Sequence, residues 1–155
     1  MAEPVPHPPS DIWPARTPRF NHVAMSVPAS LLDEDGRRDL CAFWGEVFGF
    51  TEIEQMTEPG RRLILSALHW EQFVFLIADP EPMRCPRLDH YGMSAGSLED
   101  LLAAHRRAEE FRARDNRVDL IEPSVEDHHV VKIHSFYAGY LLPMMLEIQY
   151  WEFTS

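Results

Sequence analysis

Apolar and polar residues follow two periodicities along the chain, one typical of helices and the other of strands. Residues 37–50 carry apolar side chains three and four positions apart, which predicts an amphipathic helix that ends at Gly49. Short apolar runs bounded by proline or turn residues flank this segment and predict strands at 20–27, 51–56, 61–70 and 71–78. The first half of the chain is therefore expected to have the order β-α-β-β-β.

The same order of elements returns in the second half. Residues 97–111 predict a helix with Ser97 as its N-cap and Asp100 as the capping partner. Strands are expected at 89–96 before this helix and at 118–123, 130–138 and 144–153 after it. Because supersecondary units that recur in one chain indicate an internal repeat, the sequence predicts an α+β fold. Two βαβββ repeats, residues 19–80 and 87–155, would form a cupped mixed sheet in one domain, residues 19–155.

The N-terminal segment has a different composition. Residues 1–18 contain six of the 13 prolines, and proline fixes φ and removes an N–H donor. We expect an extended arm here, which could contact a second subunit.

Charge and composition narrow the classes of partner. The net charge of −11 argues against nucleic-acid or anionic-membrane partners, which need a basic surface. No apolar run is long enough to span a bilayer, and the N-terminus does not resemble a secretory signal. Two cysteines, Cys41 and Cys85, do not make a disulfide framework. A cytoplasmic protein is expected.

Each repeat opens with a histidine followed by a similar phrase. "HVAMSV" begins at His22, and "HYGMSA" begins at His90. If the two first strands are neighbours related by a pseudo-two-fold axis, both imidazoles face one shared cleft, where neutral histidines typically hold a metal ion. The alternative is that each histidine lies on the surface or in a satisfied core.

This layout, with "FNHVAMSV" and "LDHYGMSA" on the two first strands, resembles the vicinal oxygen chelate superfamily. That group includes glyoxalases, fosfomycin- and bleomycin-resistance proteins and type I extradiol dioxygenases. The resemblance covers residues 20–153 and implies a fold built around a metal site. It says little about the reaction.

The C-terminal stretch "HHVVKIHSFYAGYLLPMMLEIQYW" is similar to the extradiol dioxygenase signature. His128, Tyr137 and Glu147 match its chemical positions. The chain departs from the signature at Tyr140 and Leu141, where an acidic or small residue and then proline are expected. It also departs at Glu126, where a small or apolar residue is preferred.

The resemblance implies that Glu147 is a third metal ligand. The residues themselves support this, because Glu147 stands in an apolar strand, where a carboxylate is costly to bury unless it meets a cation. The alternative is an edge strand from which Glu147 faces water.

Two histidines and one carboxylate leave three metal positions open, as in non-haem Fe(II) enzymes that activate oxygen. A bidentate catechol and O₂ would fill those positions. Glyoxalases of the superfamily use a fourth ligand, a carboxylate on the last strand of the first repeat. Here the aligned residue is near Leu76, and no carboxylate follows until Asp79, which counts against a glyoxalase.

By the same resemblance, His69 is expected as an acid–base, with His128 as a second histidine and Tyr137 contacting substrate oxygen. A histidine can exchange a proton at neutral pH, and a tyrosine hydroxyl can donate to an oxyanion. Other interpretations remain open: His69 in a hairpin turn, His134 instead of His128 in the cavity, and Tyr137 in the core. His105 lies on a helix stripe and is expected to be a packing residue.

The leading hypothesis is a single-domain extradiol dioxygenase with Fe(II) bound by His22, His90 and Glu147. It would cleave a small catechol with O₂ to a semialdehyde, and a catecholic amino acid such as L-DOPA is one substrate class. The alternatives are a glyoxalase-like isomerase or lyase using Mn, Ni, Co or Zn, and a metal-free drug-binding resistance protein. A homodimer is expected.

Overall fold

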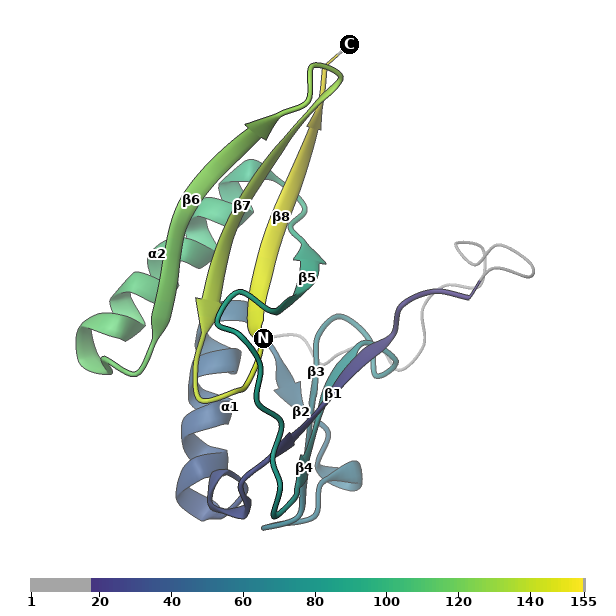
Figure 1. The fold of residues 1–155 in the computed structure, drawn as a ribbon, viewed down its shortest axis with the longest axis vertical. Helices are drawn as coiled ribbons and strands as arrows, with labels where there is room; N and C mark the ends of the chain where they lie inside the picture. The colour runs from purple at the N-terminus through teal and green to yellow at the C-terminus, as the bar shows by residue number, and fades with distance from the viewer. Residues whose placement is uncertain (1–17, 155) are drawn as a thin grey trace. The chain divides into compact units, whose positions relative to one another are not determined.

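A computed structural model describes residues 18–154 of the 155-residue chain. The expected arm therefore lies outside the described residues, apart from Pro18. The chain divides between Met83 and Arg84 into two compact units, which are described separately below (Figure 1).

The first unit has a four-stranded mixed sheet. Its elements are β1 (His22–Val27), α1 (Glu34–Phe48), β2 (Thr51–Glu52), β3 (Arg62–Ser66) and β4 (Phe73–Ala78), with short 3₁₀ turns at Ala29–Leu31 and Glu54–Met56. The strand order is β1-β4-β3-β2, with β1 parallel to β4 and the other pairs antiparallel. The strand expected over 51–56 is thus shorter than predicted, because the chain turns at Glu54.

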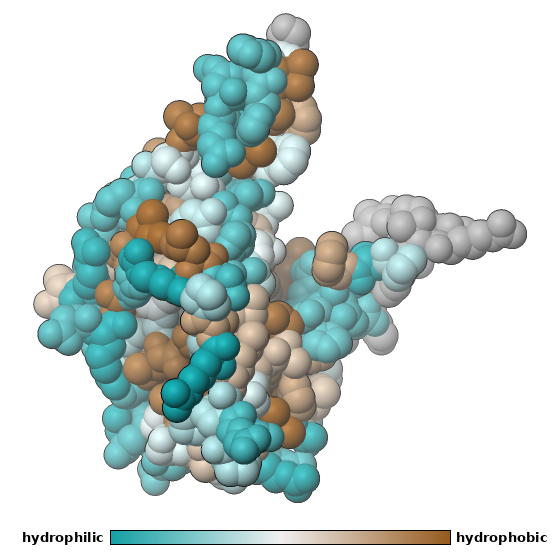
Figure 2. Space-filling model, viewed as in Figure 1, coloured by the Kyte–Doolittle hydropathy of each residue, from teal (hydrophilic) through white to brown (hydrophobic). Residues whose placement is uncertain are grey.

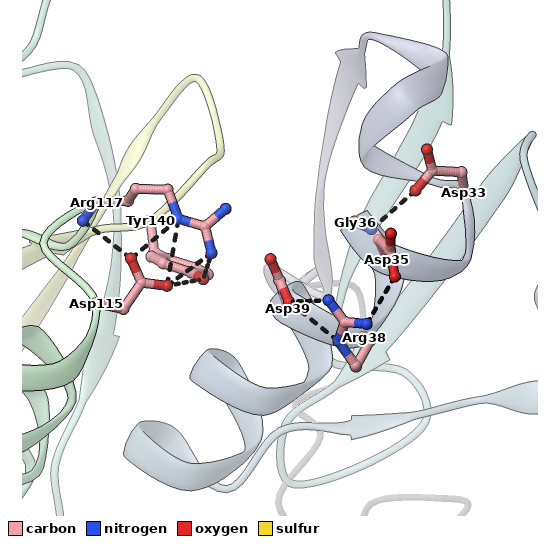
Figure 3. Close-up of polar contacts among 8 residues, drawn as sticks. All are labelled: Asp33, Asp35, Gly36, Arg38, Asp39, Asp115, Arg117 and Tyr140. Atoms are coloured by element: carbon pink, nitrogen blue, oxygen red, sulfur yellow. Dashed lines mark hydrogen bonds and ion pairs between the residues drawn. The ribbon is translucent and has the colours of Figure 1, made fainter.

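Helix α1 begins and ends as its sequence predicts. The Asp33 carboxylate accepts a hydrogen bond from Gly36 N at 2.9 Å, which caps the N-terminus (Figure 3). Gly49 ends the helix with a φ of 74°, a conformation that glycine adopts without strain. In the apolar stripe Leu40, Phe43, Trp44 and Val47 are fully buried. Phe48 is half-buried, and the Trp44 ring stacks on Phe50 just beyond the helix.

The second unit repeats this plan with longer strands. It contains β5 (His90–Ser94), α2 (Leu98–Arg114), β6 (Asp119–Asp127), β7 (Val131–Gly139) and β8 (Met145–Phe153). The order is β5-β8-β7-β6, and only the β5–β8 pair is parallel. Helix α2 covers one face of β6, β7 and β8 (Figure 1). The predicted α+β class and the two βαβββ repeats are confirmed.

The N-cap predicted for α2 is present: the Ser97 side chain accepts from Asp100 N at 3.0 Å and donates to Asp100 Oδ2 at 2.8 Å. Beyond the other end of the helix, the Asp115 carboxylate accepts hydrogen bonds from Arg117 and from the Tyr140 hydroxyl (Figure 3). These contacts tie the segment after α2 to the end of β7.

The ends of β7 and β8 near the C-terminus carry exposed apolar side chains. Val130 is 70% exposed and Phe153 is 73% exposed. Figure 2 shows hydrophobic atoms gathered at this end of the unit. Within residues 18–154, no helix combines the length and apolar character needed to cross a membrane.

Candidate metal centre

Three of the predicted site residues meet on the sheet face of the second unit that points away from α2. The face is identified by β7, where Phe136 contacts α2 through His105, so the next residue, Tyr137, points to the opposite face. Tyr137 is in register with Glu147 on β8, and Glu147 is in register with Gly92 on β5.

His90 and Glu147 are in direct contact. His90 Nε2 lies 3.2 Å from Glu147 Oε2, and the Glu147 side chain is only 9% exposed. The carboxylate therefore does not face water, which excludes the alternative orientation considered for it. A buried carboxylate is stable only beside a cation or hydrogen-bond donors.

The tautomer of His90 follows from its second ring nitrogen. Nδ1 lies 2.8 Å from the Leu88 carbonyl oxygen, which can only accept, so Nδ1 carries the proton. In the neutral ring, Nε2 then presents a lone pair toward the Glu147 carboxylate. Two electron-rich atoms at this distance need a cation between or beside them, either a proton or a metal ion. Metal-binding histidines are commonly oriented in this way by a carbonyl.

Tyr137 completes this group. Its ring meets His90 edge-on, with centroids 5.1 Å apart, and its hydroxyl is hydrogen-bonded to Glu147. Burial raises the pKa of Tyr137 to about 12, and the hydrogen bond and negative charge of Glu147 add to the shift. The hydroxyl therefore stays protonated at neutral pH and donates to the carboxylate.

Gly92 was not anticipated from the sequence. A Cβ atom at this position would lie 3.9 Å from Glu147 Oε2. The missing side chain leaves open space directly beside the carboxylate. A glycine within a strand often marks such a close approach.

In the first unit, His22 occupies the position equivalent to His90. It opens β1, and its ring stacks on Phe73 with centroids 4.7 Å apart. Its Nδ1 lies 2.6 Å from Asn21 Oδ1. An oxygen acceptor thus lies beside Nδ1 in both histidines, and Nε2 is the nitrogen that a metal ion could use. The role of Asn21 was missed, although it directly precedes the histidine.

His69 is placed differently from its expectation. It follows β3 in the turn to β4 rather than lying on the strand, and its carbonyl accepts from Gln72 N. Its side chain is buried, and its Nδ1 has no hydrogen-bond partner among the described residues. The strand ends at Ser66, and residues 67–72 form the turn to β4, which is closed by a hydrogen bond from Ala67 N to the Gln72 carbonyl.

The two histidines considered for the cavity do not lie beside Glu147. His128 is at the tip between β6 and β7, 3.4 Å from Glu126. The strand begins at Val131, and Tyr137 is a further six positions, about 20 Å, along it. His134 points to the face opposite Tyr137 and lies 2.8 Å from Glu152 Oε2. The expected inward position of His128 assumed a continuous strand, but the chain turns there.

Another departure from the extradiol signature has a structural cause. Leu141 has a φ of 60°, in the left-handed region. Proline, which the signature places there, is locked near −65° and cannot adopt this conformation. The turn before β8 is therefore built differently from the turn that the signature describes.

The register also corrects the position that corresponds to Glu147 in the first unit. Glu147 is two residues after the partner of His90, and Phe75 is two residues after Phe73, the partner of His22. The equivalent residue is therefore Phe75, not Leu76, which is fully buried. Neither residue is a carboxylate, so this position of the first unit does not supply the fourth ligand that glyoxalases use.

Comparisons with known proteins agree on the fold. No protein-family model and no curated protein matches the chain. Lactoylglutathione lyase from Agrobacterium tumefaciens is similar in structure, with a TM-score of 0.59 and 14% identity over 86% of this chain and 94% of that chain. FosX, a fosfomycin resistance protein from Listeria monocytogenes, has a TM-score of 0.59 and 10% identity over 90% of this chain and 95% of that chain.

A mutant of the same resistance protein, complexed with Mn(II) and 1S,2S-dihydroxypropylphosphonic acid, has a TM-score of 0.53 and 12% identity over 84% of this chain and 90% of that chain. The class that these likenesses define is the vicinal oxygen chelate fold. The chain has the fold of glyoxalases and fosfomycin resistance proteins.

Proposed function

We propose that this protein is a glyoxalase-like, metal-dependent lyase or isomerase that uses three protein ligands instead of the four of glyoxalases. Its substrate would be a small molecule with two neighbouring oxygen atoms. His22, His90 and Glu147 would bind one divalent ion. The contact between His90 Nε2 and the buried Glu147 carboxylate, with Nδ1 held by Leu88, is the observation that carries this proposal.

The donor set fits a divalent transition metal. Imidazole nitrogen and carboxylate oxygen suit Mn, Fe(II), Ni and Zn, and geometry and availability decide among them. The solved complex of FosX contains Mn(II), so Mn(II) is the first metal to test. His22 joins the set because it occupies the same place in its repeat as His90 and shares its anchored Nδ1.

A bound divalent ion would act as a Lewis acid on the substrate oxygens. The chain itself supplies Tyr137, whose protonated hydroxyl can donate to negative charge that develops beside Glu147. Gly92 leaves room for a substrate atom on the same side of the carboxylate. These residues are proposed to orient and stabilise the substrate.

A ring-cleaving dioxygenase is the second candidate. Tyr137, beside His90 and Glu147, could supply the hydrogen-bond donor that this chemistry needs, and two histidines with one carboxylate would be its ligand set. Two observations favour the lyase or isomerase instead: His128 is at a hairpin tip, and Leu141 has a conformation that proline cannot adopt.

One experiment separates these functions. The protein is purified without metal and loaded anaerobically with Mn(II), Ni(II), Zn(II) or Fe(II). Each form is given an epoxyphosphonate or a hemithioacetal, with product read by NMR, or catechols in air, with ring opening read as a yellow product. Rearrangement of the hemithioacetal supports the proposal, whereas addition of water to the epoxyphosphonate would replace it with an epoxide hydrolase of the same fold. Turnover of catechol by the Fe(II) form alone would replace it with the dioxygenase.

Two histidine variants control for the site. His22→Ala is expected to lose bound metal and turnover, whereas His128→Ala is expected to retain both. Full activity in His22→Ala would remove His22 from the ligand set. Activity that depends on His128 would point back to the dioxygenase.

We also propose that the protein is a homodimer, which light scattering tests directly. Coexpression of His22→Ala with Glu147→Gln then asks where each site is built. If each site combines residues of two subunits, the mixed dimer contains one intact site and recovers activity. If each site lies within one chain, the mixed dimer stays inactive.

A further inference from the structure

A second group of potential metal ligands lies on the α2 side of the second unit. It consists of His105 and Glu109 on α2 and Glu122 on β6. One ligand atom from each residue lies within 4.8 Å of the other two. His105 Nδ1 is 3.5 Å from Glu109 Oε2, and His105 Nε2 is 3.1 Å from Glu122 Oε2.

Local structure explains why these three residues meet. His105 and Glu109 are four positions apart on α2 and therefore share one helix face. Glu122 comes from the edge strand, where the register between β6 and β7 shifts between Ile121 and Ser124. Such a bulge accommodates Pro123 and changes the direction of neighbouring side chains.

The imidazole is an independent indication of a ligand. The His105 side chain is only 8% exposed, and its ring meets Phe136 edge-on. Although Nε2 is close to Glu122, its N–H direction does not produce a hydrogen bond, so this buried atom has no hydrogen-bond partner among the described residues. A buried ring nitrogen aimed at a carboxylate without a hydrogen bond is suited to a cation that both atoms can ligate.

We propose that His105, Glu109 and Glu122 bind a divalent transition metal ion, with Zn²⁺ as the representative. One nitrogen and two carboxylate oxygens are ligands that Zn²⁺ accepts at about 2.0–2.2 Å, with water completing the shell. The two glutamates are 45% and 64% exposed, so their side chains are free to close around an ion. This ion would fasten α2 to the edge strand of its sheet.

The proposed ion has two competitors on the same residues. An imidazolium ring at His105 could donate from Nδ1 to Glu109 and from Nε2 to Glu122, and Arg112 lies 3.9 Å from Glu122 Oε1. If the imidazolium or Arg112 occupies this place instead of a metal ion, no Zn²⁺ binds here. Substituting Glu109 and Glu122 then leaves the Zn²⁺ binding of the protein unchanged. The site is therefore tested through metal stoichiometry.

The test uses the full chain and Zn²⁺ in equilibrium dialysis. His90→Ala/Glu147→Gln removes ligands from the first centre and serves as the background. In this background we compare Glu109→Gln/Glu122→Gln with the control Glu110→Gln/Glu126→Gln, which also changes one residue on α2 and one on β6. These carboxylates are exposed, so folding is expected to survive, and circular dichroism checks it.

We expect the background and the control to bind one Zn²⁺ per chain and to gain thermal stability from it. Glu109→Gln/Glu122→Gln should bind at least about 10-fold more weakly and gain none. Equal binding by this variant and the control, or no binding by the background, would overturn the inference. If the proposed centre at His22, His90 and Glu147 does not exist but the site at His105 does, the wild type binds one Zn²⁺ per chain. The background variant then binds this ion equally well.

Discussion

His90 Nε2 and Glu147 Oε2 lie 3.2 Å apart, on the first and last strands of one repeat. These two strands are parallel neighbours, so the contact is fixed by sheet register rather than by a loop. The Leu88 carbonyl holds the other nitrogen of the ring. Two of the three proposed metal ligands are therefore brought together within the second unit.

Glu147→Gln is expected to weaken Mn²⁺ binding by at least about 100-fold. An amide lacks the charge of the ligand, and even the loss of a residue that only orients a ligand costs about 10–100-fold. Calorimetric titration in the Glu109→Gln/Glu122→Gln background measures this centre alone. Glu152→Gln, a carboxylate further along β8, should leave the affinity unchanged. Equal affinities for the two variants would remove Glu147 from the site.

Gly92 offers a graded test of the space beside Glu147. A Cβ would meet Glu147 Oε2 at 3.9 Å, an ordinary contact, so Gly92→Ala should bind Mn²⁺ nearly as well as the wild type. The γ carbons of valine would reach the carboxylate and restrict access to it. We expect Gly92→Val to fold, since β-branched residues suit strands, but to lose roughly 10-fold or more in affinity. Unchanged binding in Gly92→Val would mean that the ion approaches elsewhere.

Sequence periodicity was sufficient for the repeats and both helices, because these depend on local patterns such as an apolar stripe and a capping serine. It left open whether Glu147 is buried or faces water. The first-unit equivalent of Glu147 was predicted near Leu76 and is Phe75. Register decides which face a residue occupies, and it follows from strand pairing rather than from composition.

The surroundings of His128 and His105 could not be predicted from such local patterns. The inward position predicted for His128 depended on a straight strand, but the chain turns and His129 adopts a φ of 68°. His105 was expected to be a packing residue, and it is buried. Its approach to Glu122 depends on a bulge in a strand 17 positions away, which no helical pattern reveals.

Tyr137 should titrate unusually late. Its pKa of about 12 reflects burial first and Glu147 second. The phenolate absorbance of the wild type minus that of Tyr137→Phe should therefore rise near pH 12, with circular dichroism confirming the fold. In Glu147→Gln the same difference should rise at lower pH, because the carboxylate no longer opposes the phenolate. An unchanged midpoint would show that Tyr137 and Glu147 are not in contact.

Asp115 should make stability depend on pH at the acidic end. Hydrogen bonds from Arg117, and then from Tyr140, hold the pKa of its carboxyl well below the ordinary value. A lowered pKa in the folded state stabilises the protein above the unfolded pKa of about 3.9, and this contribution is lost as pH falls through the folded pKa. Asp115→Asn should therefore lower the free energy of unfolding by about 1–2 kcal/mol at pH 7, with a smaller difference below pH 4.

Figure 3 contains the matched control for this prediction, a second aspartate–arginine pair. Asp35 lies 2.6 Å from Arg38, but its side chain is 81% exposed, and such pairs contribute little because water and salt screen them. Asp35→Asn should have nearly the same urea midpoint as the wild type, both at pH 3 and at pH 7. If both variants show the same pH dependence, the shift at Asp115 comes from general charge rather than from its hydrogen bonds to Arg117 and Tyr140.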